Sequence, residues 1–258
     1  MEEKLLELEH VSKTFSGGKG KTVEAVKDVS FTVYKNESLG IVGESGCGKS
    51  TIARMITGLT AVSSGKILME GNVISGLNRR EQREVYRNIQ MVFQDPYSAI
   101  SPRMPVGTFL GEGLVHFGIM NRKEAEAEAG RLLEMVDLEP QLADRLPHQL
   151  SGGQLQRVVI ARAISIHPRL VILDEATSAL DVSVQKQILE LLVRLQKEFH
   201  LTYLFIGHDL AVVRSITKQI CVMKDGRIIE KVASASLLEK AGENYTKQLL
   251  SSVFSVRE

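Results

Sequence analysis

Residues 43–50 read Gly43-Glu44-Ser45-Gly46-Cys47-Gly48-Lys49-Ser50, which fits the phosphate-binding pattern G-x-x-x-x-G-K-[ST]. An apolar run at residues 39–42 precedes the pattern, and a segment with helical spacing at residues 51–56 follows it. The pattern requires this strand–loop–helix context. Its glycines let successive backbone N–H groups point at one anion, and the helix adds the positive end of its dipole. The stretch therefore predicts a phosphate site within an α/β fold.

Three side chains of this loop have distinct expected properties. Lys49 would supply a point charge to the β- and γ-phosphates of a nucleotide, and the Ser50 hydroxyl suits Mg²⁺, which prefers hard oxygen ligands. Cys47 occupies a variable position of the pattern, beside a helix N-terminus where the thiolate form is expected to be favoured. The alternative, a glycine-rich turn without a ligand, is disfavoured because both the strand and the helix are predicted.

The composition of the whole chain excludes several classes of protein. Its 258 residues carry a formal net charge of +1, which lacks the basic footprint of a dedicated nucleic-acid binder, so no nucleic-acid partner is expected. Cys47 and Cys221 form no Cys-x-x-Cys pair, which argues against a zinc site or a disulfide framework and favours a reducing cytosol. The apolar runs are too short to cross a bilayer, so any membrane role is expected to come through a partner.

Away from the loop, the hydrophobic pattern predicts two kinds of strand. Residues 6–9 and 29–33 alternate apolar with polar side chains, as strands with one solvated face do. A glycine-rich segment at residues 16–21 predicts a hairpin loop between them. Short runs rich in Val, Ile and Leu predict buried parallel strands at residues 39–42, 170–173 and 203–206.

Between about Pro102 and Leu150 the spacing becomes helical. Asn121 followed by Glu124 is typical of a helix start, a capping residue with an acid three positions on. The acids Glu124, Glu126 and Glu128 are expected on its solvated face. One face is then apolar, with Ala125, Ala129, Leu132, Leu133 and Val136. The pattern predicts a helical insert that divides an α/β core.

The predicted strand at residues 170–173 is followed by two carboxylates, Asp174 and Glu175. Asp174 would hold Mg²⁺, directly or through water, as the second acidic element of phosphate-loop enzymes does. Glu175 would then orient and deprotonate the attacking water. Alone, such a pair is often a helix cap, but downstream of a phosphate loop it indicates nucleotide hydrolysis.

The segment Leu150-Ser151-Gly152-Gly153-Gln154 resembles the signature motif of ABC ATPases. Physically it is a turn of small residues that opens a helix at residues 155–164. The resemblance implies that its N–H groups and the Ser151 hydroxyl form a second phosphate site, for the ATP that a partner subunit holds. A plain helix-capping turn is the alternative interpretation of its local structure.

Further elements follow in the order that the family keeps. Phe15 matches the aromatic residue that stacks on adenine, and Gln94 matches the glutamine loop that touches Mg²⁺. Asp181 matches the loop that crosses the dimer interface, and His208 matches the switch histidine that contacts the γ-phosphate. Taken singly, Phe15 would more often be a core residue and His208 a structural one.

The resemblance thus implies four sets of site residues. The catalytic set is Glu175, His208 and Gln94. The Mg²⁺ set is Ser50, Gln94 and Asp174. The nucleotide-binding set is Phe15, Gly43, Glu44, Ser45, Gly46, Cys47, Gly48, Lys49, Ser50 and Thr51. The set for the partner's ATP is Ser151, Gly152, Gly153 and Gln154, with Asp181 in the dimer loop.

The fold that the resemblance implies is α/β, a phosphate-loop NTPase (RecA-like) core with an antiparallel β subdomain and a helical insert that carries the signature. One ABC ATPase domain is expected over residues 1–258, with its core at about 1–95 and 155–235, the helical subdomain at 96–154 and a helical tail at 236–258. In this family two cassettes close head to tail on ATP, so the chain is expected to hydrolyse ATP poorly until it is paired.

Two segments resemble the importer branch for oligopeptides, dipeptides and nickel. They are Gln94-Asp95-Pro96-Tyr97-Ser98, followed by Pro102-Arg103-Met104, and the C-terminal Tyr245-Thr246-Lys247-Gln248-Leu249-Leu250. Ala99-Ile100-Ser101 departs from the usual wording of the first segment, and the short tail is more similar to nickel or metal-chelate members.

Importers of this branch combine a second, different ATPase subunit with two membrane-spanning permease subunits and an external solute-binding protein. The resemblance therefore places the chain at the cytoplasmic face of a membrane, bound through the permease. Since the cargo binds to other chains, these residues leave peptides, nickel and metal chelates all open. The alternatives are the ATPase of an exporter or of a complex that moves no solute.

Overall fold

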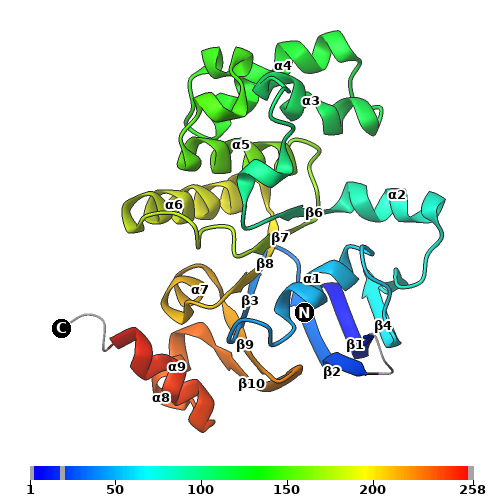
Figure 1. The fold of residues 1–258 in the computed structure, drawn as a ribbon, viewed down its shortest axis with the longest axis vertical. Coiled ribbons are helices and arrows are strands. Elements are labelled where there is room, and N and C mark those ends of the chain that lie inside the picture. Colours follow the sequence, from blue (N-terminus) through cyan, green and yellow to red (C-terminus); the bar gives the residue numbers. More distant parts are fainter. Residues whose placement is uncertain (1–2, 18–20, 255–258) are drawn as a thin grey trace. The chain divides into compact units, whose positions relative to one another are not determined.

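The structure of the chain is a computed structural model that describes residues 3–17 and 21–254 (Figure 1). Contacts group the chain into two compact units. One takes the residues up to Tyr86 and from Thr202 onward, and the other is Arg87–Leu201. Each unit is built around parallel strands. The expected bounds of core, helical subdomain and tail remain a prediction.

An antiparallel sheet begins the first unit. Its strand order is β2-β1-β4-β5, with β1 (Lys4–Ser16), β2 (Thr22–Tyr34), β4 (Ser64–Met69) and β5 (Asn72–Val73). In β2, Phe31 and Val33 are buried while Ser30 is exposed, so the predicted alternation and the predicted antiparallel subdomain are confirmed. Of the predicted hairpin loop, residues 18–20 lie outside the described residues. The N–H of Gly17 donates to the carbonyl of Lys21 at 2.6 Å and closes the strand pair.

The parallel strands of the first unit centre on β3 (Ser38–Val42). It pairs in parallel with β8 (Thr202–Gly207) and β9 (Gln219–Lys224), and β10 (Arg227–Ala233) is antiparallel to β9. Every residue of β3 and β8 is buried, as continuous apolar runs predict. The helices of this unit are α1 (Lys49–Ile56), α2 (Arg79–Asn88, which ends in the other unit), α7 (Leu210–Ile216), α8 (Leu237–Lys240) and α9 (Asn244–Phe254).

The second unit holds a pair of parallel strands, β6 (Ile89–Val92) and β7 (Leu170–Asp174). Its α-helices are α3 (Val106–His116), α4 (Arg122–Met135), α5 (Gly152–Ile164) and α6 (Val182–Phe199). Single 3₁₀ turns lie at η2 (Pro96–Ala99), η3 (Pro140–Asp144) and η4 (Pro147–Gln149). Figure 1 shows α3, α4 and α5 side by side, and the three helices contact one another pairwise. The predicted helical insert is therefore confirmed.

Helix α4 follows the sequence prediction closely. Asn121 caps it, with Oδ1 accepting from the N–H of Glu124 at 3.0 Å, and the Glu124 carboxylate accepts in return from the N–H of Asn121 at 2.8 Å. Leu132 and Leu133 are buried with the rest of the predicted apolar face. Burying such a leucine contributes about 1.5–3 kcal/mol, which exceeds the roughly 1 kcal/mol of a cap. Packing therefore holds this helix, and the cap fixes where it begins.

Two helices begin earlier than predicted. Helix α1 begins at Lys49 rather than Thr51, and α5 begins at Gly152 rather than Leu155. In α5 the first turn contains two glycines, whose low helix propensity hides the turn from any pattern based on apolar spacing. Among residues 3–17 and 21–254, no helix is both long enough and apolar enough to span a membrane.

Candidate nucleotide-binding site

The phosphate loop leaves β3 at the carboxyl edge of the first unit's parallel strands. Lys49, in the first turn of α1, is only 4% exposed. Its Nζ donates to the carbonyl oxygens of Gly43 at 2.7 Å and Glu44 at 2.8 Å. These bonds compensate the burial of an ammonium, which would otherwise be costly. The side chain is thus held against the loop that it is predicted to serve.

Gly48 at the N-cap of α1 requires the absence of a side chain. Its φ is +110°, and an added Cβ would lie 2.3 Å from the carbonyl oxygen of Ala25. A glycine also has no side-chain oxygen to accept from the first N–H groups of the helix, as the side chains of common N-cap residues do. Those N–H groups and the helix dipole therefore suit an anion such as a phosphate.

Cys47 does not meet the expectation for its thiol. The side chain is buried, and burial raises the pKa of the Cys47 thiol more than the nearby Lys49 lowers it. The prediction that the helix N-terminus favours a thiolate is therefore wrong, because desolvation outweighs the attraction of Lys49 and of the nearby backbone N–H groups.

His208 lies at the same edge as the loop. Val42 of β3 pairs with Gly207 of β8 in a parallel register, so the residues that follow, Gly43 and His208, leave neighbouring strands together. His208 is exposed at this edge. The structure thus places the predicted switch histidine at the same strand edge as the predicted phosphate loop.

Phe15 lies near the end of β1 and is 42% exposed, so the alternative that it is a core residue is wrong. Lys13 Nζ lies 4.9 Å from the centroid of its ring. An exposed ring of this kind can stack on a base, although the role at adenine remains a prediction.

In the second unit, the same arrangement of strands places Gln94, Asp174 and Glu175 at one edge. Val92 of β6 pairs with Leu173 of β7, so the glutamine loop and the two acids leave the same edge of the strand pair. Asp174 is buried, whereas Gln94 is exposed.

The backbone at Glu175 changes direction sharply. Its φ is +51°, a left-handed conformation that costs a non-glycine residue about 1–2 kcal/mol. The Glu175 carbonyl accepts from Ser178 twice, from its N–H at 3.1 Å and from its hydroxyl at 2.9 Å, which holds the turn. The strand alternation that would place the two acids on opposite faces therefore ends at Glu175.

The signature segment is a capped helix start. Ser151 Oγ accepts from the N–H of Gln154 at 3.2 Å, and Gln154 Oε1 accepts from the N–H of Ser151 at 2.9 Å. The interpretation as a capping turn is thus confirmed, and it is compatible with a phosphate contact because the Ser151 proton can still donate. At Gly153 an added Cβ would lie 2.6 Å from Val184 Cγ1, so packing against α6 requires this glycine.

Asp181 also caps a helix. Its Oδ1 accepts from the N–H groups of Ser183 and Val184, both at 3.0 Å, and from the Ser183 hydroxyl at 2.7 Å. The bond from the Val184 N–H, followed by that from Ser183, lowers the pKa of the Asp181 carboxyl. The role in a dimer interface remains a prediction, as do the other assigned roles.

Three further residues were given no role by the sequence. Tyr97 Oη makes a long contact of 3.5 Å with the carbonyl of Leu150, joining the glutamine loop to the signature. Asp137 binds Arg157 of α5 at 3.1 Å and Arg194 of α6 at 2.8 Å. Tyr245 accepts from the backbone of the phosphate loop. Tyr97 and Tyr245 belong to the two sequence segments that resemble the importer branch. Their contacts could not be predicted from a sequence pattern, because each joins residues far apart in the chain.

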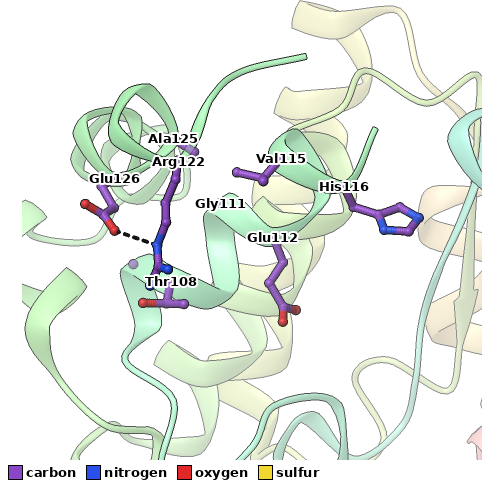
Figure 2. Close-up of a pocket in the computed structure, with 9 residues that line it drawn as sticks. Thr108, Gly111, Glu112, Val115, His116, Arg122, Ala125 and Glu126 are labelled. Carbon is purple, nitrogen blue, oxygen red and sulfur yellow. Dashed lines mark hydrogen bonds and ion pairs between the residues drawn. The ribbon is translucent and has the colours of Figure 1, made fainter. Parts of the chain in front are cut away.

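A separate cavity of about 360 Å³ lies along α3 and α4. Figure 2 shows Arg122 and Glu126 of α4 at this cavity, joined by an ion pair of 3.3 Å, with Thr108 of α3 nearby. None of the predicted nucleotide, metal or catalytic residues lines it.

A protein-family model described as ABC transporter matches residues 26–178, which include the phosphate loop, the signature and the acid pair. The chain belongs to the ABC transporter family. Its resemblance to ABC ATPases, drawn from the motifs, is therefore confirmed.

A named relative agrees with this assignment. The oligopeptide transport ATP-binding protein OppF of Bacillus subtilis (strain 168) is 46% identical to this ABC chain over 255 residues, covering 98% of the chain and 83% of the relative. The alignment with OppF covers the C-terminal segment at residues 245–250 as well as the motifs.

Solved structures match the fold. A dimeric post-hydrolysis state of the ATP-binding cassette MJ0796 bound to ADP and Pi is similar with a TM-score of 0.80 at 31% identity, covering 89% of this chain and 99% of that one. CbiO1 from Clostridium perfringens, part of the ABC transporter complex cbiONQ, gives 0.79 at 28% identity over 99% and 96% of the two chains. The predicted fold is confirmed, and the chain is an ABC ATPase.

Proposed function

We propose that the chain is the ATP-hydrolysing subunit of a multi-subunit ABC importer that energises the uptake of peptides. The observation that carries the proposal is the placement of every predicted catalytic side chain at a carboxyl edge of parallel strands. Peptides are the proposed cargo class because the OppF relative is named for oligopeptide transport. That name favours peptides over the nickel and metal-chelate alternatives.

The first unit is proposed to bind the nucleotide. The N–H groups at the start of α1 donate to its phosphates, and Lys49, which is bonded to the loop at Gly43 and Glu44, supplies a positive charge. His208 contacts the γ-phosphate from the end of β8, and Phe15 stacks on the adenine. A neutral, exposed aromatic ring beside Lys13 suits a base that needs stacking more than hydrogen bonds.

The second unit is proposed to carry out the hydrolysis. Glu175 orients the attacking water and accepts its proton, a task worth about a hundredfold to ten-thousandfold in rate. The proposed Mg²⁺ ligands are Ser50, Gln94 and Asp174. Their hydroxyl, amide and carboxylate oxygens form the hard donor set that Mg²⁺ prefers, so the residues fit the ion. When bound, Mg²⁺ neutralises charge on the phosphates.

The remaining site residues are proposed to act across subunits. Ser151 to Gln154 contact the ATP of a second ATPase subunit, and Asp181 lies in the loop between the two. Two membrane-spanning permease subunits and an external solute-binding protein complete the complex. The permease holds the chain at the cytoplasmic face of the membrane.

The test is purification of the complex with a tagged Glu175→Gln variant, in mild detergent with Mg-ATP. This variant keeps the size of the side chain and loses the base, so we expect a trapped assembly and a fall in ATPase rate of at least about a hundredfold. Glu190→Gln, the same change at an exposed glutamate of α6, is the control and should turn over normally.

Co-purification of two permease subunits, a second ATPase and a binding protein that binds peptides would support the proposal. Ribosomes, DNA or the absence of any membrane protein would overturn the importer. A binding protein that takes nickel or a metal chelate would overturn the cargo class. Near-normal ATPase activity of Glu175→Gln in the complex would overturn the catalytic assignment.

A further inference from the structure

The C-terminal helix reaches the phosphate loop through Tyr245. The backbone N–H of Glu44 donates to the hydroxyl oxygen of Tyr245 at 3.1 Å, although the two residues are 201 positions apart. Tyr245 is only 7% exposed, at the start of α9. This hydrogen bond joins the C-terminal helix directly to the backbone of the phosphate loop.

The position of the phenol is fixed from several sides. Lys224 Nζ lies 4.8 Å from the centroid of its ring. Glu230 of β10 anchors the start of α9, since its carboxylate accepts from the N–H of Gly242 at 2.7 Å and from the hydroxyl of Thr246. Burial raises the pKa of Tyr245, so the phenol stays neutral. These contacts hold the hydroxyl in place.

Glu44 is bonded on its other side by the loop's lysine. The Glu44 carbonyl accepts from Lys49 Nζ at 2.8 Å, and its N–H donates to Tyr245. One residue of backbone thus joins the tail to the ammonium that is predicted to bind phosphate. If the N–H lost its partner, the segment would be less restrained, and a smaller fraction of the loop would hold the binding conformation.

We propose that Tyr245 is a positioning residue for ATP binding, whose hydroxyl fixes the Glu44 backbone and, through it, Lys49. The inference rests on the proposed function, since it requires that this loop bind the phosphates. It gives the C-terminal segment a role in nucleotide affinity.

The test is Tyr245→Phe in the assembled transporter, which removes one oxygen and keeps the ring beside Lys224. We expect the Kd for Mg-ATP, measured by displacement of a fluorescent nucleotide, to rise roughly threefold to tenfold, the worth of one neutral hydrogen bond. KM should rise in parallel while kcat stays within about twofold, because the chemical step uses other residues.

Two control variants separate positioning from general stability. Tyr34→Phe makes the same change in β2 and should leave the Kd unchanged. Thr246→Val removes the hydroxyl that Glu230 binds but keeps the phenol and the bond from Gly242. It should lower the melting temperature at least as much as Tyr245→Phe does, and it should raise the Kd for Mg-ATP less.

An unchanged Kd in Tyr245→Phe would overturn the inference. So would a Thr246→Val variant that weakens ATP binding as much as Tyr245→Phe does, because the tail would then act only through stability. Lys49→Ala tests the proposed site itself. If that variant bound ATP like the wild type, the phosphate site would be misassigned whatever the result at Tyr245.

Discussion

The N-termini of helices α1 and α5 are both proposed to bind phosphate, yet they are built in opposite ways. Helix α1 starts at Gly48, which offers no side-chain acceptor, whereas α5 starts at Ser151, which forms a reciprocal cap with Gln154. At α1 the N-cap residue has no side chain that accepts from the first N–H groups, whereas at α5 the cap already satisfies part of them. This difference supports the proposal that α1 binds the nucleotide of its own subunit, while α5 adds a contact to the ATP of a second subunit.

Gly48→Ala would break the open end and should have the largest effect. Alanine must adopt a φ of +110° with its Cβ 2.3 Å from a carbonyl oxygen, so the loop has to move. We expect ATP affinity, measured by nucleotide displacement, to fall about tenfold to hundredfold. Gly71→Ala is the matched control, because Gly71 has a φ of +78° with nothing within 4 Å of the added Cβ. Wild-type affinity in Gly48→Ala would contradict the prediction.

Replacing Ser151 would open the capped end. Ser151→Ala should cost about 1 kcal/mol of unfolding free energy and Ser151→Gly only a few tenths, as at other N-caps. Both remove the hydroxyl, so both should reduce the ATPase rate of the assembled complex. Urea unfolding and turnover, measured on the same variants, separate the two effects. If Ser151→Gly kept full turnover, the hydroxyl would be a cap and nothing more.

The capped helix is also anchored from its side, where Asp137 binds Arg157 and Arg194. Asp137→Asn removes the charge and keeps a residue that tolerates the φ of +57°. Since these pairs are partly exposed, we expect a loss of about 0.5–1 kcal/mol in unfolding free energy. Asp144→Asn in η3 serves as the control. A loss no larger than in the control would mean that the pairs do not hold α5.

Asp181 caps the start of α6, and the stability that this cap contributes should depend on pH. Its carboxylate accepts from backbone N–H groups, which lowers its pKa in the folded chain. Its stabilising effect is therefore complete above the unfolded value of about 3.9 and is lost as the pH falls through the lower folded value. The unfolding midpoint, followed from about pH 6 down to pH 2, should fall less steeply in Asp181→Asn. Identical slopes would contradict the assignment.

The buried strands and the helical insert could be predicted because continuous apolar runs and one apolar helix face leave little choice of structure. The motif order likewise predicted which residues gather at strand ends. The helix start at Gly152 was missed because glycine carries no periodic signal, and the start at Lys49 because Lys49 and Ser50 are polar residues of the phosphate-binding pattern. The state of the Cys47 thiol was mispredicted because burial depends on packing rather than on position relative to a helix. The Tyr245 contact joins residues that only the folded chain brings together.

The bonds from Lys49 to the carbonyls of Gly43 and Glu44 have a consequence for turnover. A phosphate that reaches this ammonium competes with two oxygens of the loop itself, so binding is an exchange of partners rather than a gain of new ones. The net affinity is then a small difference between similar energies. A lysine without these carbonyls would hold phosphate more tightly and release product more slowly. An ATPase that must release its product in every cycle benefits from a lysine that can bond again to these two carbonyls.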